Sequence, residues 1–440
     1  MNPIPRTPGP GANRIQTLNY GLTKVAFPNR VFETFDVLSA RSPMLPPSEE
    51  ELLRNRIALP IGCLPLRQML KPGESVAVAV SDVTRYSATE KLLTPLLRET
   101  DAAGIPRDRV TLYVARGTHR ALSVEELRSV VGPEISTGIH VEQSDPDGET
   151  VRVGTTSRGT PVMLCRSLTE KDRVVLTGTI SFHYFAGFGG GRKALVPGCA
   201  ARKTAEATHF RIFLPDGPGK HPLARPGMLA GNPVHEDIVE AVSMAPPSFL
   251  VNTLLTPDKQ LFDAVAGHWQ KAHEEGCERY ARIYRVRIPR RYPLVIASAG
   301  GYPKDINFIQ AHKAMDQAFA ALEPGGALIL LAECPDGFGS PQFFPWFRFS
   351  EAAEMEAELR ANYQIYGQTA HAALVKAGAC RAILISSLRP GDVERMGMTP
   401  AASLGEAVDM ARRHLGGLPP PLVIPDAGYV LPDPPERSKC

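Results

Sequence analysis

The sequence predicts an α/β protein made of two α/β domains with largely parallel sheets. Short apolar runs rich in β-branched residues alternate with helical patterns, and this alternation restarts after about residue 280. A chain of 440 residues also exceeds the size of one common hydrophobic core. We therefore expect an N-terminal domain over 1–280, a C-terminal domain over 281–417 and a Pro-rich tail over 418–440.

The N-terminal half contains three predicted strands, and helical patterns follow the first two. The strands are 75–82, 110–117 and 172–179, and the helices lie near 89–103 and 123–132. Short apolar runs followed by helices are typical of parallel strands that are buried on both faces. Ligands of such sheets collect at the carboxyl ends of the strands, so the segments after these three strands are expected to converge.

The C-terminal half repeats this pattern with strands near 292–303, 326–339 and 380–387 and a helix over 306–322. The basic stretch 279–291 is interpreted as a solvated connector between the domains. A nucleic-acid-binding role would require an aromatic platform or a basic fold motif beside it, and neither is present in the sequence.

Composition and charge exclude several classes of protein. The formal net charge is only +3, which gives no reason to expect a nucleic-acid or membrane partner. No apolar run approaches the roughly 20 residues of a membrane span, and the polar start lacks the apolar region of a signal peptide, so a cytoplasmic location is expected. The seven cysteines contain no C-x-x-C pair, which argues against a disulfide framework and a zinc ribbon.

The segment SFHYFAGFGGGRKA, residues 181–194, follows the third predicted strand and carries the most chemistry. Its glycines allow backbone N–H groups to approach a ligand, so they predict a cradle for an anion, with His183 and Lys193 at the rim. The Walker A pattern fails here, because Lys193 is followed by alanine. A G-x-G-x-x-A match at 189–194 is a weak dinucleotide signal, because about ten residues separate it from the strand.

Two further histidines stand at informative positions. His119 follows the second predicted strand in GTHR, and His209 comes sixteen residues after Lys193. A lone loop histidine is more often an ordinary polar residue than a catalyst. His235 is intermediate, since Asn232 is a natural cap for a helix that begins there. The other histidines have no comparable setting and are interpreted as structural, and these are His140, His221, His268, His273, His312, His371 and His414.

The sequence resembles the nickel-dependent lactate racemase family in four features. These are the GTHR motif, the H-x-F-A-G-F motif, a lysine ten residues after His183 and a histidine sixteen residues after that lysine. The resemblance covers roughly residues 20–415. It implies that His119 and His183 form a catalytic acid/base pair and that His209 binds nickel. It also implies that Lys193 carries, through a thioamide, a nickel-pincer nucleotide, which is a pyridinium-3-thioamide-5-thiocarboxylic acid mononucleotide.

The segment SDVTRYS matches the D-x-T-R motif of the same family with Asp82, Thr84 and Arg85. The resemblance implies that Arg85 binds the substrate, and an arginine fork suits a carboxylate. The alternative is a surface arginine paired with Asp82. The predicted cofactor-binding residues are Lys193, Asp82, Thr84, Gly189, Gly190 and Gly191.

The segment GGYPKDINFIQAHKA resembles the second-domain motif of the family. Gln310 and Lys313 lie one turn apart, so on a helix they share a face and are predicted to hold the substrate carboxylate. Asp305 and Asn307 are expected to cap that helix. Two departures from the family are Lys304, which replaces a neutral residue, and the missing active-site tryptophan, for which Tyr363, Tyr366 and Trp346 are the candidates.

The resemblance implies an isomerase, namely a racemase or epimerase of a 2-hydroxy acid that works by transient hydride transfer to the nickel-pincer nucleotide in a cleft between the domains. Two bases are needed, one for each enantiomer, and histidine titrates in the working range. The expected partners are the small 2-hydroxy acid and the cofactor-biosynthesis proteins, and a homo-oligomer stays open. Two alternatives are an NAD(P)-dependent 2-hydroxy-acid oxidoreductase and a non-catalytic protein that binds a nucleotide cofactor.

Overall fold

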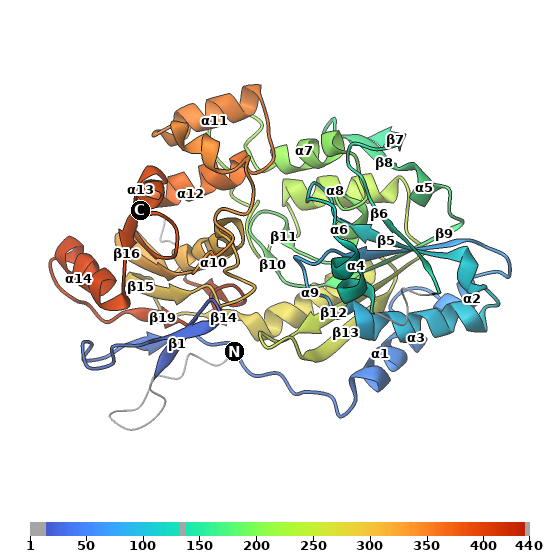
Figure 1. Ribbon diagram of the computed structural model, residues 1–440, viewed down its shortest axis with the longest axis horizontal. Helices are drawn as coiled ribbons and strands as arrows, with labels where there is room; N and C mark the ends of the chain where they lie inside the picture. Colours follow the sequence, from blue (N-terminus) through green and yellow to red (C-terminus); the bar gives the residue numbers. More distant parts are fainter. Residues whose placement is uncertain (1–14, 133–137, 436–440) are drawn as a thin grey trace. The chain divides into compact units, whose positions relative to one another are not determined.

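The computed structural model describes residues 15–132 and 138–435, and these form two compact units (Figure 1). One unit spans 42–282. The other combines the described residues before 42 with those from 283 onward. The boundary between the units falls beside the basic stretch, where helix α9 (Lys271–Tyr284) ends and strand β14 (Arg285–Arg287) begins. The segment expected as a solvated connector is thus the end of a helix followed by a short strand.

The unit 42–282 is built on a six-stranded sheet with the order β13-β12-β9-β4-β5-β6. All neighbouring strands are parallel except the pair β12 and β13, which is antiparallel. The central strands are almost fully buried, as their unbroken apolar sequences predict. The strands are β4 (Val76–Ser81), β5 (Val110–Ala115), β6 (His140–Gln143), β9 (Arg173–Thr179), β12 (Phe249–Leu255) and β13 (Leu261–Gly267).

Helices and two small hairpins complete this unit. Leu92 and Leu96 of α3 pack with Val78 and Val80 of β4 in one hydrophobic core. The helices are α1 (Glu49–Ala58), α2 (Leu66–Met69), α3 (Thr89–Ala102), α4 (Val124–Val131), α5 (Arg166–Thr169), α6 (Arg192–Leu195), α7 (Arg202–Phe210), α8 (Pro233–Ser243) and α9. The hairpins are β7 (Thr150–Thr155) with β8 (Pro161–Cys165), and β10 (Phe182–His183) with β11 (Gly187–Phe188).

The second unit is built on a fully parallel six-stranded sheet with the order β18-β17-β16-β15-β19-β3. Its strands are β3 (Asp36–Val37), β15 (Tyr292–Ser298), β16 (Leu322–Leu331), β17 (Arg381–Ile385), β18 (Thr399–Ala401) and β19 (Leu422–Ile424). Its helices are α10 (Phe308–Ala320), α11 (Ala352–Ala361), α12 (Gly367–Ala379), α13 (Pro390–Arg395) and α14 (Leu404–Leu415). A hairpin of β1 (Thr17–Tyr20) and β2 (Thr23–Ala26) belongs to the same unit, and β14 pairs with β20 (Leu431–Asp433).

The α/β class and the two largely parallel sheets are confirmed, and each strand and helix that the sequence predicted is present. The division at the two ends of the chain differs from the expected one. Strand β3 lies beside β19 at the edge of the second sheet, so residues near 36 do not belong with 42–280, and part of the expected tail is sheet. Strands of two or three residues are too short to produce a periodic pattern, which is why the sequence missed them.

None of the helices in the described part of the chain is long and apolar enough to cross a membrane.

Candidate functional site

Three predicted site segments leave the carboxyl ends of three adjacent strands in the unit 42–282. Strand β4 leads to Asp82, β5 leads to the loop with His119, and β9 leads to the loop with His183. The strand order changes direction between β9 and β4, because the chain runs from β4 to β5 and β6 on one side and from β9 to β12 and β13 on the other. Such a switch point is where parallel sheets bind ligands.

Asp82 and His119 are bound to each other at this edge. Asp82 is buried, and its carboxylate accepts hydrogen bonds from Nδ1 of His119 and, at 2.8 Å, from the hydroxyl of Thr84. Burial alone would raise the pKa of the Asp82 carboxyl, but the hydrogen bond and charge of His119 and the charge of Arg85 hold that pKa below its ordinary value. Because Nδ1 of His119 donates to Asp82, Nε2 of the neutral ring carries the lone pair.

Arg85 is exposed at the same edge, and its backbone N–H donates to the carbonyl of Asp82 at 3.1 Å. No ion pair joins the guanidinium of Arg85 to Asp82 among the residues that the structure describes. The alternative of a surface pair between these two side chains is therefore not what the structure shows.

His183 has the opposite hydrogen-bonding arrangement from His119. It lies in the small hairpin of β10 and β11, opposite Gly187. Its Nδ1 accepts from the backbone N–H of Ala186 at 3.2 Å, so the proton of the neutral ring resides on Nε2. The two predicted catalytic histidines thus present one unprotonated and one protonated Nε2.

The ring of Phe185 contacts three of the predicted site residues. The ring centroid of His183 lies 4.5 Å away, that of His209 lies 5.0 Å away, and Nζ of Lys193 lies 5.5 Å away. Lys193 is only 5% exposed. Residues 183, 193 and 209, spread over 27 positions of the sequence, therefore meet around one aromatic side chain.

His209 is held as a neutral imidazole. Its Nδ1 lies 2.6 Å from the carbonyl oxygen of Ala205 on the same helix, α7, and donates to it. Burial and the positive charge of Lys193 lower the pKa of His209 to about 3. Its Nε2 is therefore an unprotonated nitrogen, which is the form that binds a metal, oriented by a bond on the opposite side of the ring.

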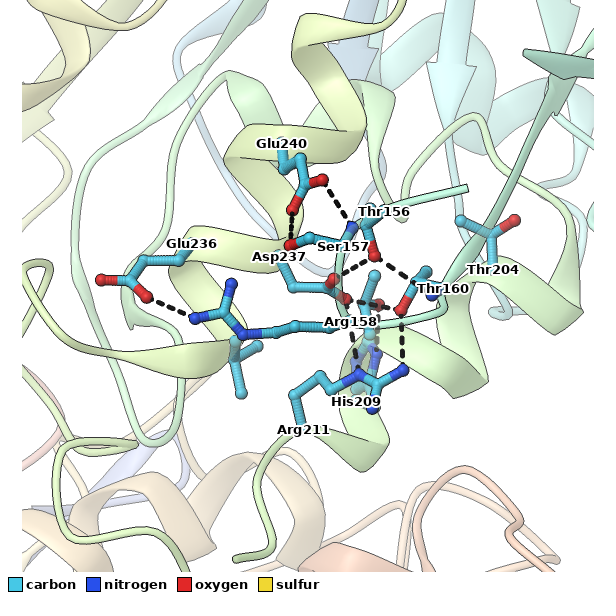
Figure 2. A network of polar contacts seen from close by, with 12 residues as sticks. Thr156, Ser157, Arg158, Thr160, Thr204, His209, Arg211, Glu236, Asp237 and Glu240 are labelled. Atoms are coloured by element: carbon cyan, nitrogen blue, oxygen red, sulfur yellow. Dashed lines mark hydrogen bonds and ion pairs between the residues drawn. The ribbon is translucent and has the colours of Figure 1, made fainter. Parts of the chain in front are cut away.

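A buried polar network fixes the position of α7 (Figure 2). Asp237 of α8 is fully buried and accepts from the hydroxyls of Thr156 at 2.6 Å and Thr160 at 2.7 Å. Arg211 comes two residues after His209. Its Nε lies 3.8 Å from Oδ2 of Asp237, and its Nη2 donates to the hydroxyl of Thr160 at 3.3 Å. The helix that presents His209 is thereby tied to α8 and to the turn between β7 and β8.

The glycines of the loop serve close packing as well as any ligand. A Cβ atom on Gly187 would lie 1.9 Å from the carbonyl oxygen of Met228, and one on Gly191 would lie 2.5 Å from Cδ1 of Leu250. Only Gly189 has ordinary clearance on all sides within this run. Protein atoms thus already fill the space beside most of these glycines, and the predicted cradle for an anion stays a prediction.

The loop does not have the geometry of a dinucleotide fingerprint. Between β9 and Gly189 the chain forms the small hairpin of β10 and β11, and the helix that follows, α6, has only four residues. The fingerprint requires a tight turn directly from a strand into a helix that binds the pyrophosphate. This arrangement does not support the NAD(P)-dependent alternative.

In the second unit, Gln310 and Lys313 share one face of α10, and Nζ of Lys313 donates to Oε1 of Gln310 at 2.6 Å. Asn307 caps this helix, since its side chain accepts from the backbone N–H of Gln310, as predicted. Asp305 is not a cap of the helix. Its carboxylate accepts from the backbone N–H groups of Gly21 at 2.7 Å and Glu333 at 3.2 Å, which ties the β1 and β2 hairpin to this unit.

The two departures from the family both lie in the second unit. Nζ of Lys304 sits 4.1 Å from the ring centroid of Tyr429, and burial lowers the pKa of Lys304 to about 8. Trp346 is buried, and a Cβ atom on Gly367 would lie 2.7 Å from its ring. A tryptophan therefore packs against the first residue of α12, close in sequence to Tyr363 and Tyr366, although it comes from a different segment of the chain.

Sequence reasoning missed a buried cluster directly beside Lys193. Arg192 is fully buried, and its guanidinium contacts His235 of α8 and His273 of α9. His273 was interpreted as an ordinary histidine and His235 only as a residue in the first turn of a helix. No spacing pattern relates positions 192, 235 and 273, because three different elements bring them together, so one sequence alone offers no signal for this cluster.

Among residues 15–132 and 138–435, no three His, Cys, Asp or Glu side chains gather closely enough to hold a metal ion by themselves. His209 is therefore a single imidazole donor that requires other donors to complete a metal site.

Comparisons with known proteins identify the family of the chain. Residues 20–218 match the lactate racemase N-terminal domain, and residues 290–431 match the lactate racemase C-terminal domain. The lactate racemase of Thermoanaerobacterium thermosaccharolyticum is 30% identical over 437 residues, which is 94% of this chain and 97% of that protein. The lactate racemase of Lactiplantibacillus plantarum is 32% identical over 299 residues, covering 68% of this chain and 69% of that protein.

Solved structures extend the comparison. The lactate racemase apoprotein from Thermoanaerobacterium thermosaccharolyticum superposes with a TM-score of 0.85 at 30% identity, over 95% of this chain and 99% of that one. A Thermotoga maritima protein shares the fold, with a TM-score of 0.66 at 17% identity over 90% of this chain and 100% of that one. Both family domains and a relative of full length thus match, and the chain belongs to the lactate racemase family of racemases and epimerases.

Proposed function

We propose that this isomerase inverts C2 of a small 2-hydroxy acid and that it uses a nickel-pincer nucleotide linked to Lys193. The observation that carries the proposal is the meeting of His183, Lys193 and His209 around Phe185, beside the carboxyl ends of β4, β5 and β9. These side chains are an acid/base group, an attachment site and a metal donor. The family supports the combination, because its lactate racemases match both domains.

The residues of this chain fit the cofactor. His209 would offer one neutral imidazole nitrogen to nickel, and the pincer itself would supply the remaining donors. Lys193 is nearly buried beside an aromatic ring, which suits an uncharged amide-like linkage better than a solvated ammonium. When bound, the cofactor supplies a reversible acceptor for hydride from C2.

The two histidines move the proton of the substrate hydroxyl. Nε2 of His119 is the base, because Asp82 holds its other nitrogen as a donor and stabilises the imidazolium that forms. Nε2–H of His183 donates a hydrogen bond to the oxygen of the same hydroxyl, because the backbone N–H of Ala186 occupies its Nδ1. His183 acts as the acid when its ring carries a second proton, so that giving up one proton leaves a neutral imidazole. For the opposite enantiomer the roles exchange, so one pair serves both directions. Arg85, Gln310 and Lys313 are proposed to bind the substrate carboxylate.

The experiment that tests this function uses protein co-expressed with the cofactor-biosynthesis proteins, which we propose as its partners in the cell. Intact mass should show an added pyridinium mononucleotide, metal analysis should show nickel, and D- or L-lactate should be inverted. Deuterium at C2 of the substrate should stay at C2 after inversion, because hydride does not exchange with water. Washout of the label would contradict hydride transfer, and NAD(H) release without nickel would favour the oxidoreductase.

The metal arm of this test uses His209→Ala, which should lower bound nickel at least about tenfold with the fold intact. His221→Ala is the matched control, since His221 lies in the same unit and uses its Nδ1 to accept from the backbone of Leu223. Unchanged nickel in His209→Ala would place the donor elsewhere.

A further inference from the structure

A buried guanidinium lies in the residue next to Lys193. Arg192 is 0% exposed, and Nη1 lies 2.7 Å from Nε2 of His273 while Nη2 lies 2.9 Å from Nδ1 of His235. Nη2 also donates weakly, at 3.4 Å, to the carbonyl oxygens of Ala186 and Phe188. The side chain therefore connects α6, α8, α9 and the backbone of the 183–191 loop.

Both imidazoles in this cluster are neutral. A guanidinium has only donors, so Nδ1 of His235 accepts from Nη2 and the proton of that ring resides on Nε2. Nε2 of His273 lies between Nη1 of Arg192 and the carbonyl oxygen of Gly189. Burial and the charge of Arg192 lower the pKa of His235 to about 3, and the same causes lower the pKa of His273 well below its usual value. The cluster therefore keeps the full positive charge of Arg192 at neutral pH.

No carboxylate balances this charge. Within the described residues no Asp or Glu oxygen lies within 4.0 Å of Arg192, and Glu274 acts on it only from a greater distance. Burial lowers the pKa of Arg192 to about 10, which leaves it charged at neutral pH. Buried charges are ordinarily paired, because an unpaired one loses its hydration without compensation. An Asp or Glu in place of either histidine would satisfy the same donors and remove the charge.

The unbalanced charge is directed at the loop that ends in Lys193. The nitrogen of His273 that faces Arg192 also lies 2.8 Å from the carbonyl oxygen of Gly189. A Cβ atom on Gly190 would lie 2.9 Å from the ring of His273. The cluster is thus packed directly beneath the loop backbone, with Lys193 as the next residue. In a medium of low dielectric constant a charge at this place raises the electrostatic potential over the whole loop.

We propose that Arg192, held by two neutral histidines, is the built-in countercharge for the phosphate of a mononucleotide at the 187–193 loop. This inference rests on the proposed function for the identity of the ligand. Arg192 has no exposed surface, so it acts through space and through the loop as a positioning residue. The histidines contact Nη1 and Nη2 without neutralising the guanidinium, so its charge stays available to the ligand, which a carboxylate partner would not allow.

The test compares two substitutions of nearly identical shape and different charge. His235→Asn keeps a neutral acceptor near the position of Nδ1, and His235→Asp replaces it with a carboxylate. The probe is nicotinic acid mononucleotide, titrated calorimetrically into the full-length protein without cofactor, and intact mass of co-expressed protein gives a second readout. We expect His235→Asp to bind the probe about tenfold more weakly than His235→Asn and to load less cofactor.

Stability separates this role from a structural one. His235→Asp forms an ion pair with Arg192, so its melting temperature should equal or exceed that of His235→Asn, although it binds less. Nicotinamide riboside, which lacks the phosphate, should show no such difference between the two variants. His273→Gln and His273→Glu form the second pair, which decides the question if a His235 variant does not fold.

Equal binding and equal loading within both pairs would overturn the inference while leaving the proposed function intact. A wild-type protein that neither binds the probe nor gains mass on co-expression would overturn both. Weaker binding by both members of a pair, with no difference due to charge, would show that the histidines serve packing alone and would also overturn the countercharge.

Discussion

The two units place polar side chains at the carboxyl ends of their sheets but treat charge differently. In the second unit Lys313 donates to Gln310, Asp305 accepts two backbone N–H groups, and the buried Lys376 and Asp316 pair at 2.7 Å. In the unit 42–282, Arg192 is buried without a carboxylate and His209 is kept neutral. The polar groups named in the second unit have partners within the protein, whereas we propose that a ligand completes the group of charges in the unit 42–282.

The largest effect that tests this contrast is loss of the attachment site. Among the lysines of residues 15–132 and 138–435, Lys193 alone has the loop position, the burial and the aromatic contact that we propose for covalent attachment. Lys193→Ala should therefore abolish the added mass of the loaded protein, as read by intact mass spectrometry. Lys203→Ala, which removes an exposed lysine of α7, is the matched control and should load fully. Retention of the added mass in Lys193→Ala would move the linkage to another residue.

The next largest effect concerns the two histidines. His119→Asn and His183→Asn each remove one side of the acid/base pair, so each should lower racemisation by about 10²-fold or more. The double variant should be little worse than either single one, because inversion requires both proton transfers. Circular dichroism or chiral chromatography of lactate measures the rate. Effects that multiply in the double variant would show that the histidines act independently.

Asp82→Asn sharpens the same comparison, since it keeps the shape of the carboxylate but can no longer stabilise the imidazolium of His119. It should lower kcat by about tenfold or more with little change in nickel content. His140→Asn is the control, because His140 is an exposed residue of β6 and its ring nitrogen Nε2 lies 3.1 Å from Glu142.

The sequence could predict the long elements and, through the family resemblance, most of the candidate site residues. The runs 76–80 and 112–115 are short and apolar, which favours strands buried on both faces. The two- and three-residue strands β3 and β19 carry no periodic signal, so the assignment of both chain ends failed there. Their place depends on backbone pairing between residues about 390 positions apart, which a local pattern cannot show.

The candidate site divides in the same way. His119 and His183 follow strand ends, whereas Lys193 and His209 lie on the short helices α6 and α7, and the resemblance to the lactate racemase family selected all four as candidates. Their hydrogen bonds were not predictable, because the opposite tautomers of His119 and His183 depend on Asp82 and on the backbone of Ala186. The Arg192 cluster could not be predicted, because it forms only when distant elements pack together. Asn252 and Leu250 of β12 and His273 of α9 pack around the glycines of the loop.

Acid should destabilise the unit 42–282 through its neutral histidines. The pKa values of His209 and His235 are about 3 in the folded protein and near 6.5 in the unfolded chain, so the unfolded state binds more protons between these limits. Their contribution to stability is complete above pH 6.5 and is lost as the pH falls toward 3. At pH 5 each such histidine should cost about 1–2 kcal/mol of unfolding free energy.

Each unit contains one of the two tryptophans, which allows this loss to be measured separately. Trp269 lies in the unit 42–282 and Trp346 in the other. In a Trp346→Phe background, urea unfolding followed by fluorescence reports the stability of the unit 42–282. His235→Asn should weaken the dependence of this unfolding free energy on pH between 5 and 7. An identical slope with and without His235 would mean that this histidine is not held neutral.

The smallest expected effect lies in the second unit, at Lys304. Burial lowers its pKa from 10.5 to about 8, so below pH 8 the folded protein bears the cost of a poorly solvated ammonium, which the ring of Tyr429 only partly offsets. Lys304→Met should therefore raise stability by about 1 kcal/mol at pH 7. As the pH rises from 8 to 10.5 the unfolded chain binds more protons than the folded one, so the wild type gains stability and the difference between the two proteins should close.

Unfolding followed through Trp346 in a Trp269→Phe background measures the stability difference at pH 7 and at pH 10.5. A difference that is constant from pH 7 to 10.5 would assign the gain to packing of the methionine, and the charge at this position would then cost the second unit nothing, in keeping with its otherwise balanced polar groups.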